Sequence, residues 1–109
     1  MEYLESLDLN HFDSSLVTNI RAIFYGCYSI YLSNFNTSLV QDMGSIFEGC
    51  NSLISINLTN FDTSCAYYMD WMFYGCSSLE LIDLSHFNTT NVISMYNMFS
   101  GCSSLISID

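Results

Sequence analysis

Five cysteines carry the most versatile side-chain chemistry in this sequence, because a thiolate can bind a metal, form a disulfide or attack a substrate. Four of them follow a glycine, at Cys27, Cys50, Cys76 and Cys102, and the fifth is Cys65. Zinc ligands converge from several directions at close spacing, whereas these four are separated by 23, 26 and 26 residues. We therefore expect a column of buried free thiols, with Cys65 as the most accessible one, and no metal site.

The two histidines, His11 and His86, are candidate general bases. They are 75 residues apart, and the repeat described below would place three units, or roughly 14 Å, between them. A catalytic nucleophile and its base must lie within hydrogen-bonding distance of each other. The sequence therefore predicts isolated surface histidines, no catalytic or cofactor-binding residue, and a protein that is not an enzyme.

The charge of the chain excludes two classes of partner. Its 109 residues include 11 acids and one base, Arg21, so the formal net charge is -10. Such a surface repels phosphate backbones and anionic lipid headgroups, which excludes nucleic-acid binding and membrane-surface binding. Residues 84–108 carry no formal charge when His86 is neutral, but their many Ser, Asn and Thr side chains exclude membrane insertion. The N-terminus is acidic, so we expect no signal peptide in this chain.

An internal repeat supplies the elements that must position these residues. The Gly-Cys pairs recur in step with a phenylalanine, and both series have spacings of 23, 26 and 26 residues. Such a period indicates stacked units that bury their apolar residues against one another. We therefore expect a single solenoid domain over residues 1–109. It consists of four repeats and a truncated fifth, at 4–29, 30–52, 53–78, 79–104 and 105–109.

Each repeat has two halves with different apolar periods. The alternation at Ile56 and Leu58 predicts a strand with one buried face, and we expect strands over 55–59 and 81–85. In the second half, a polar trio suited to a helix N-terminus precedes apolar residues at steps of 3, 3 and 1 within 40–47. The glycine that follows suits the left-handed position at a helix end. The sequence therefore predicts an α/β repeat, with a short parallel sheet on one face and short helices on the other.

The first half of the repeat also matches the leucine-rich-repeat pattern L-x-x-L-x-L, so the expected fold is a right-handed leucine-rich-repeat solenoid. The whole unit, F-D/N-T-S followed by M-F-x-G-C-S-S-L, resembles the BspA-type leucine-rich-repeat family of bacterial surface proteins, most closely over residues 88–105. The second repeat departs from this pattern because three residues are missing between Ser29 and Ile30. The resemblance implies a cell-surface or secreted adhesion protein that binds host proteins or matrix, and it brings no catalytic residue.

Aromatic residues gather in the third repeat, at helix positions that should face outward: Tyr67, Tyr68, Trp71 and Tyr74. Three of them have the spacing i, i+4 and i+7, which would align them in one stripe on a helix. Clustered solvent-facing aromatics often mark binding surfaces. In the alternative interpretation, the rings lie flat over neighbouring helices and merely cover the core.

The favoured function is a binding module with a protein or glycan partner and no cofactor. The alternative is a purely structural spacer within a longer repeat array. The apolar edge strand expected at Leu105, Ile106 and Ile108 is a template for pairing with another chain. We therefore expect that the chain is a fragment of a longer array or that it associates end to end.

Overall fold

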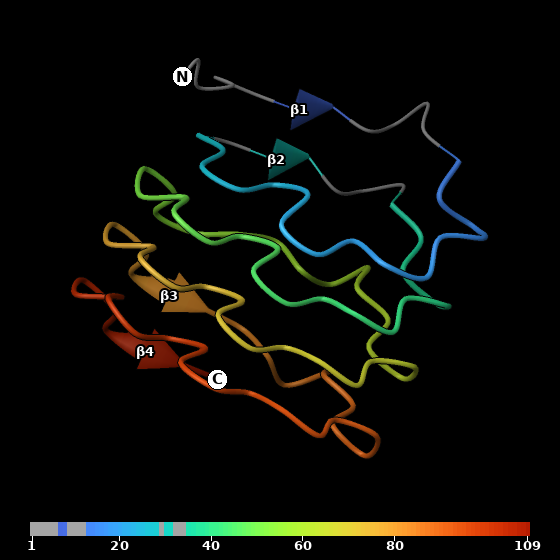
Figure 1. Ribbon diagram of the computed structural model, residues 1–109. Helices are drawn as coiled ribbons and strands as arrows, with labels where there is room; N and C mark the ends of the chain where they lie inside the picture. The colour runs from blue at the N-terminus through green and yellow to red at the C-terminus, as the bar shows by residue number, and fades with distance from the viewer. Residues whose placement is uncertain (1–6, 9–12, 29, 32–34) are drawn as a thin grey trace.

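The successive repeats lie side by side, and the chain passes through them in order from its N-terminus to its C-terminus (Figure 1). The computed structural model describes residues 7–8, 13–28, 30–31 and 35–109. Its principal extents are 32 × 30 × 23 Å. His11 is among the residues that lie outside the described part.

The strands of the described residues are short and parallel. β1 (Leu7–Asp8) pairs with β2 (Ile30–Tyr31), and β3 (Leu81–Ile82) pairs with β4 (Ser107–Ile108). An isolated bridge from Ser55 to Leu81 connects the third repeat to β3. Each strand has two residues and not the five expected over 81–85.

A side-chain hydrogen bond explains why β3 ends early. The Asp83 carboxylate Oδ1 accepts the Ser85 N–H at 2.9 Å and the Ser85 hydroxyl at 2.6 Å. In the third repeat, Asn57 Oδ1 accepts the Thr59 N–H at 3.0 Å in the same way. These local bonds bend the backbone and occupy N–H groups that a longer ladder would need.

The second half of each repeat contains no helix among the described residues, so the prediction of short helices was wrong there. The third repeat instead forms consecutive tight turns, in which alternate N–H groups donate to the carbonyl three residues earlier. Such bonds join Met72 to Met69, Tyr74 to Trp71 and Cys76 to Phe73, at 3.3, 3.1 and 3.1 Å. No helix of the described residues has the length and apolarity needed to span a membrane.

The remaining N–H groups of these turns donate to the next repeat. Four such bonds of 2.8–2.9 Å join the third repeat to the fourth: Met69 to Ser94, Trp71 to Tyr96, Phe73 to Met98 and Gly75 to Ser100. Parallel bridges join Asn19 to Asp42, Asp42 to Tyr68 and Tyr68 to Ser94. The bridged residues are 23, 26 and 26 positions apart, the same spacings as those of the Gly-Cys pairs.

Left-handed backbone explains why turns form in place of a helix. Each repeat has two residues with positive φ, one of which is the glycine of the Gly-Cys pair, with φ between 71° and 80°. The other, four residues earlier, is Ala22, Ser45, Trp71 or Asn97, with φ between 52° and 59°. A left-handed residue at this interval interrupts a right-handed helix in every repeat. The N–H groups that a helix would use internally are therefore free to join neighbouring repeats.

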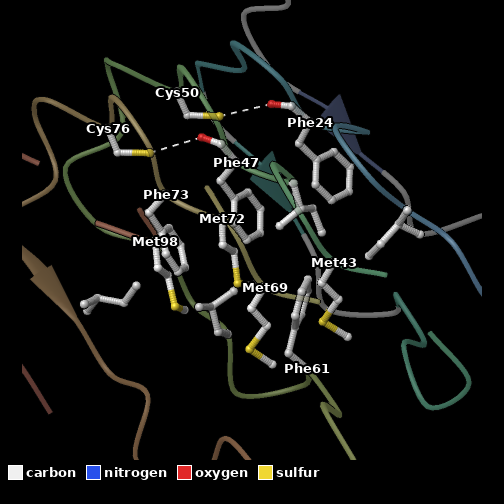
Figure 2. Packing of buried hydrophobic residues seen from close by; sticks show 14 of the residues in the cluster. Phe24, Met43, Phe47, Cys50, Phe61, Met69, Met72, Phe73, Cys76 and Met98 are labelled. Atoms are coloured by element: carbon white, nitrogen blue, oxygen red, sulfur yellow. Dashed lines mark hydrogen bonds between the residues drawn. The ribbon is translucent and has the colours of Figure 1, made fainter. Parts of the chain in front are cut away.

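The core is a set of columns that run through the stack (Figure 2). The ring centroids of Phe24 and Phe47 are 5.7 Å apart, those of Phe47 and Phe73 are 5.4 Å apart, and those of Phe73 and Phe99 are 5.6 Å apart. All three pairs are stacked, with interplanar angles of 14°, 19° and 3°. Burial of these rings and of the neighbouring methionines supplies the main stabilisation of a fold with so little sheet.

The polar trio at the middle of each repeat connects neighbouring repeats. The buried Thr37 hydroxyl donates to the Asp62 carbonyl at 2.9 Å and accepts the Asp62 N–H at 2.8 Å. Thr63 makes the same two bonds to Asn88, at 3.2 and 2.8 Å. These threonines therefore satisfy backbone groups of the following repeat, where the sequence had predicted a helix cap.

Candidate functional site

The cysteine column lies behind the turns and bonds to the backbone of the preceding repeat. The Cys50 thiol donates to the Phe24 carbonyl at 3.0 Å and the Cys76 thiol to the Phe47 carbonyl at 3.1 Å (Figure 2). Burial raises the pKa of Cys50 and of Cys76 to about 12. A protonated thiol is a weak nucleophile and a poor metal ligand. The structure therefore gives these cysteines a packing role.

The other candidates for chemistry are separate from one another. Cys65 is a free thiol and is half-buried, as is Cys102 at the end of the column. The His86 ring nitrogen Nε2 contacts the Leu58 carbonyl, and the ring packs edge-on against Phe87. Within the described part of the chain, no three Cys, His, Asp or Glu side chains are grouped so that they could hold a metal ion.

The aromatic stripe, defined as Tyr67, Tyr68, Trp71 and Tyr74, is exposed along the outside of the third repeat. Each of its side chains is 37–42% exposed. The helical spacing from which the stripe was predicted does not exist, because this segment consists of turns. The stripe forms because the residues between its members, among them Met69, point inward and are fully buried.

The backbone of the stripe is held on both sides by hydrogen bonds. The Tyr67 N–H donates to the Gln41 carbonyl at 2.8 Å, and the Tyr67 carbonyl accepts the Ile93 N–H at 2.8 Å. Trp71 donates to the Tyr96 carbonyl at 2.8 Å although its φ of 55° is unfavourable for a large L-residue. The rings are therefore presented from a fixed backbone, which lowers the entropic cost of contact with a partner.

Two further apolar residues extend the stripe and were missed from the sequence. Tyr96 is 65% exposed, and its ring lies edge-on to Trp71 with centroids 5.9 Å apart. Ile93 is 71% exposed and occupies in the fourth repeat the position that Tyr67 has in the third. The 26-residue step was a sufficient signal for Ile93, whereas Tyr96 aligns with Asp70 and only the structure shows its contact with Trp71.

An ion-pair network borders the stripe. Arg21 Nε lies 2.9 Å from Asp42 Oδ2, and Arg21 Nη2 lies 3.0 Å from Asp70 Oδ2. The hydrogen bond to Asp42 is the main cause of a raised pKa of Arg21. Burial alone would raise the pKa of Asp70, but hydrogen bonds from Arg21 and Ser94 outweigh it and hold the pKa below 3.8. Both carboxylates therefore stay ionised, and with one cation between two anions the network has a net negative charge.

A family model described as "Mycoplasma protein of unknown function, DUF285" matches residues 1–107. No curated protein and no solved structure matches the chain.

Proposed function

The chain belongs to the DUF285 family, and for this member we propose a non-enzymatic binding module whose aromatic stripe contacts a protein or glycan partner. The stack of turns would be a leucine-rich-repeat solenoid of the BspA type, displayed on a cell surface or secreted, with the stripe on its outside. Adhesion to another protein or to matrix is the role that this arrangement serves best.

The observation that carries the proposal is the exposure of four large aromatic side chains on one repeat. The second repeat has Gln41, Ser45 and Glu48 at the positions of Tyr67, Trp71 and Tyr74. Small or polar residues therefore suffice for the fold at these positions. Tyrosine and tryptophan dominate the energetically important residues of protein interfaces, because each buries a large area and retains a polar group.

The surrounding charge favours a partner with basic groups. Asp42 and Asp70 lie beside the stripe, Arg21 neutralises only one of these two charges, and the whole chain carries a formal net charge of -10. A Lys or Arg of a partner can lie over the face of a Trp or Tyr ring in a cation–π contact. Long-range attraction of the same sign would speed the encounter at low ionic strength.

The test is binding to a panel of immobilised fibronectin, laminin, type I collagen and neutral oligosaccharides. The variant Tyr67→Ser/Trp71→Ser/Tyr74→Ser should weaken binding to the matching panel member by about tenfold or more, since interface aromatics are typical hot spots. Leu16→Ser is the matched control, because Leu16 is an exposed apolar residue of the first repeat and should leave binding unchanged.

Two results would contradict the proposal. Equal binding by the stripe variant and the unchanged chain would place the contact elsewhere on the molecule. Failure of the unchanged chain to bind any panel member would favour a spacer that displays another domain.

A further inference from the structure

The last complete repeat presents a row of backbone donors at one end of the stack. The N–H groups of Met95, Asn97, Phe99 and Gly101 have no acceptor among the described residues. Their equivalents one repeat earlier all donate to the fourth repeat: Met69, Trp71, Phe73 and Gly75. The donor row is thus a ladder edge that lacks its next member.

The first repeat presents the complementary row of acceptors at the other end. The carbonyls of Asn19, Arg21, Ile23 and Tyr25 accept no hydrogen bond from the described part of the chain. The equivalent carbonyls of the second repeat accept N–H groups of the first: Asp42, Gly44, Ile46 and Glu48. Because every step of the ladder runs from a donor to a carbonyl of the next repeat, the two end rows have matching polarity and spacing.

The same two ends expose apolar side chains that are buried inside the stack. Met95 is 47% exposed, whereas Met43 and Met69 in the same column are fully buried. At the opposite end, Ile23 is 43% exposed, whereas Ile46 in its column is fully buried. A further repeat placed against either end would cover these side chains and gain the corresponding hydrophobic stabilisation.

Charge does not oppose a contact between the two different ends. Residues 84–108 contain no Asp, Glu, Lys or Arg, so the donor end is formally uncharged when His86 is neutral. The acids of the first repeat therefore meet no acid of the fourth, and in β4 (Ser107–Ile108) the exposed Ile108 adds apolar surface to the donor end. Repulsion between copies comes mainly from their total charge, which salt screens.

We propose that the donor end of one copy binds the acceptor end of a second copy and continues the ladder across the junction. Met95, Asn97, Phe99 and Gly101 would donate to the carbonyls of Asn19, Arg21, Ile23 and Tyr25 of the second copy. The contact is head-to-tail, so each copy keeps one free end and the assembly grows without closing. A second copy is the occupant because this chain itself carries the matching edge in the matching register. The inference does not depend on the proposed function.

Sedimentation of the intact chain at increasing concentration tests the proposal. The weight-average mass should rise continuously beyond that of a dimer, and the rise should be greater at high salt, because screening weakens repulsion between copies of net charge -10. A constant monomer mass at all concentrations and salt levels would overturn the proposal.

Two blocking variants test the head-to-tail geometry. Met95→Glu places a charge on the donor end, and Ile23→Glu places one on the acceptor end. Each variant alone should sediment as a monomer, because every junction then contains one blocked edge. An equimolar mixture should form a dimer and stop there, since one variant keeps an intact acceptor end and the other an intact donor end.

The mixture also shows that both variants are folded, because a dimer requires an intact edge from each. Leu16→Glu and Trp71→Ser are the controls, one for added charge and one for association through the stripe, and both should assemble like the unchanged chain. Self-association of Ile23→Glu alone would indicate that donor ends pair with each other and would overturn the proposal. Monomers in the mixture would overturn it as well, when far-ultraviolet circular dichroism matches the unchanged chain.

Discussion

Arg21 Nη2 lies 3.0 Å from Asp70 Oδ2 although a whole repeat separates the two residues. The guanidinium group crosses the intervening second repeat at Gly44, where a Cβ atom would overlap its Nη2 and Cζ atoms. The contact with Asp42 on the way gives the only base of the sequence an ionic partner in each of the next two repeats. Gly44 is therefore a residue whose missing side chain permits a contact between two others.

Gly44→Ala should remove the contact between Arg21 and Asp70 with little net change in stability. The half-exposed pair contributes about 0.2–1 kcal/mol, and replacing glycine by alanine stabilises by about 0.4–1 kcal/mol where the backbone is compatible. The φ of Gly44 is not in the left-handed region, so the two effects should nearly cancel. Urea denaturation of the unchanged chain and of Gly44→Ala measures the difference.

The control is the same substitution in an Arg21→Gln background. There the overlap is gone, so Gly44→Ala should raise the free energy of unfolding by about 0.4–1 kcal/mol. An identical effect of Gly44→Ala in both backgrounds would show that Arg21 does not pass over Gly44.

Asp70 should make the stability of the chain depend on acid pH. Its pKa is below 3.8 in the folded protein, where burial opposes and hydrogen bonds from Arg21 and Ser94 favour the ionised form. A lowered pKa in the folded state gives stabilisation that is present above the unfolded pKa and is lost as the pH falls through the folded pKa. Carboxyl-detected NMR titration should therefore place Asp70 below an ordinary Asp.

Arg21→Gln should raise the pKa of Asp70, because burial then acts against fewer compensating hydrogen bonds. The carboxyl of Asp62, which has a lowered pKa through hydrogen bonds from Ser64, is the internal control and should not move. An unchanged pKa of Asp70 in this variant would contradict the ion pair.

The thiol column should make the stability fall at alkaline pH. The pKa values of Cys50 and Cys76 are raised by burial from 9.0 to about 12. The stabilisation that comes from keeping these thiols neutral is complete below pH 9 and is lost as the pH rises to about 12. Because tyrosines also ionise in this range, the measurement is a comparison of urea denaturation between variants.

Cys50→Ala/Cys76→Ala should show a smaller alkaline loss of stability than the unchanged chain, and Cys65→Ser should show the same loss as the unchanged chain. In the folded protein at neutral pH, a thiol reagent should modify Cys65 before the buried Cys50 and Cys76. Rapid modification of Cys50 or Cys76 under native conditions would contradict their burial.

Trp71 should be replaceable by asparagine with little loss of stability. Its φ of 55° costs about 1–2 kcal/mol for an L-residue, and Asn97 adopts nearly the same backbone in the next repeat. Relief of this strain should offset much of the packing lost with a half-buried ring. Trp71→Asn should therefore change the free energy of unfolding by less than about 1.5 kcal/mol, whereas Phe73→Ala should cost about 3–5 kcal/mol.

Trp71→Ala separates strain from packing, because alanine removes the ring and tolerates this backbone less well than asparagine. It should be less stable than Trp71→Asn by about 1 kcal/mol. Equal stability of the two variants would mean that the left-handed backbone at Trp71 stores no strain.

The sequence carried the repeat spacing and most of the core but not the turns. Glycine was expected in the left-handed position before each column cysteine, and the positive φ of Gly26, Gly49, Gly75 and Gly101 confirms this. The helix prediction failed because a second left-handed position falls on Ala22, Ser45, Trp71 and Asn97. Apart from Asn97, these residues show no preference for such backbone, so their conformation is imposed by bonding between repeats.

The stripe residues could be found from the sequence because an outward position in a stack is visible as a column of unlike residues. Tyr67 aligns with Gln41 and Ile93, which share no property except exposure to solvent. The contact between Trp71 and Tyr96 and the passage of Arg21 over Gly44 could not be found in this way. Both depend on where side chains cross from one repeat to another, which the spacing of residues does not encode.

Trp71 is the only tryptophan of the chain, so its substitution by 5-fluorotryptophan gives a single fluorine NMR signal from the centre of the stripe. The most direct test of the binding function is to add the panel member that the chain binds and to observe this signal. The account predicts that the signal shifts or broadens in proportion to the bound fraction and that a fluorinated Tyr28 far from the stripe does not respond. Binding with an unchanged Trp71 signal would contradict the assignment of the aromatic stripe as the contact surface.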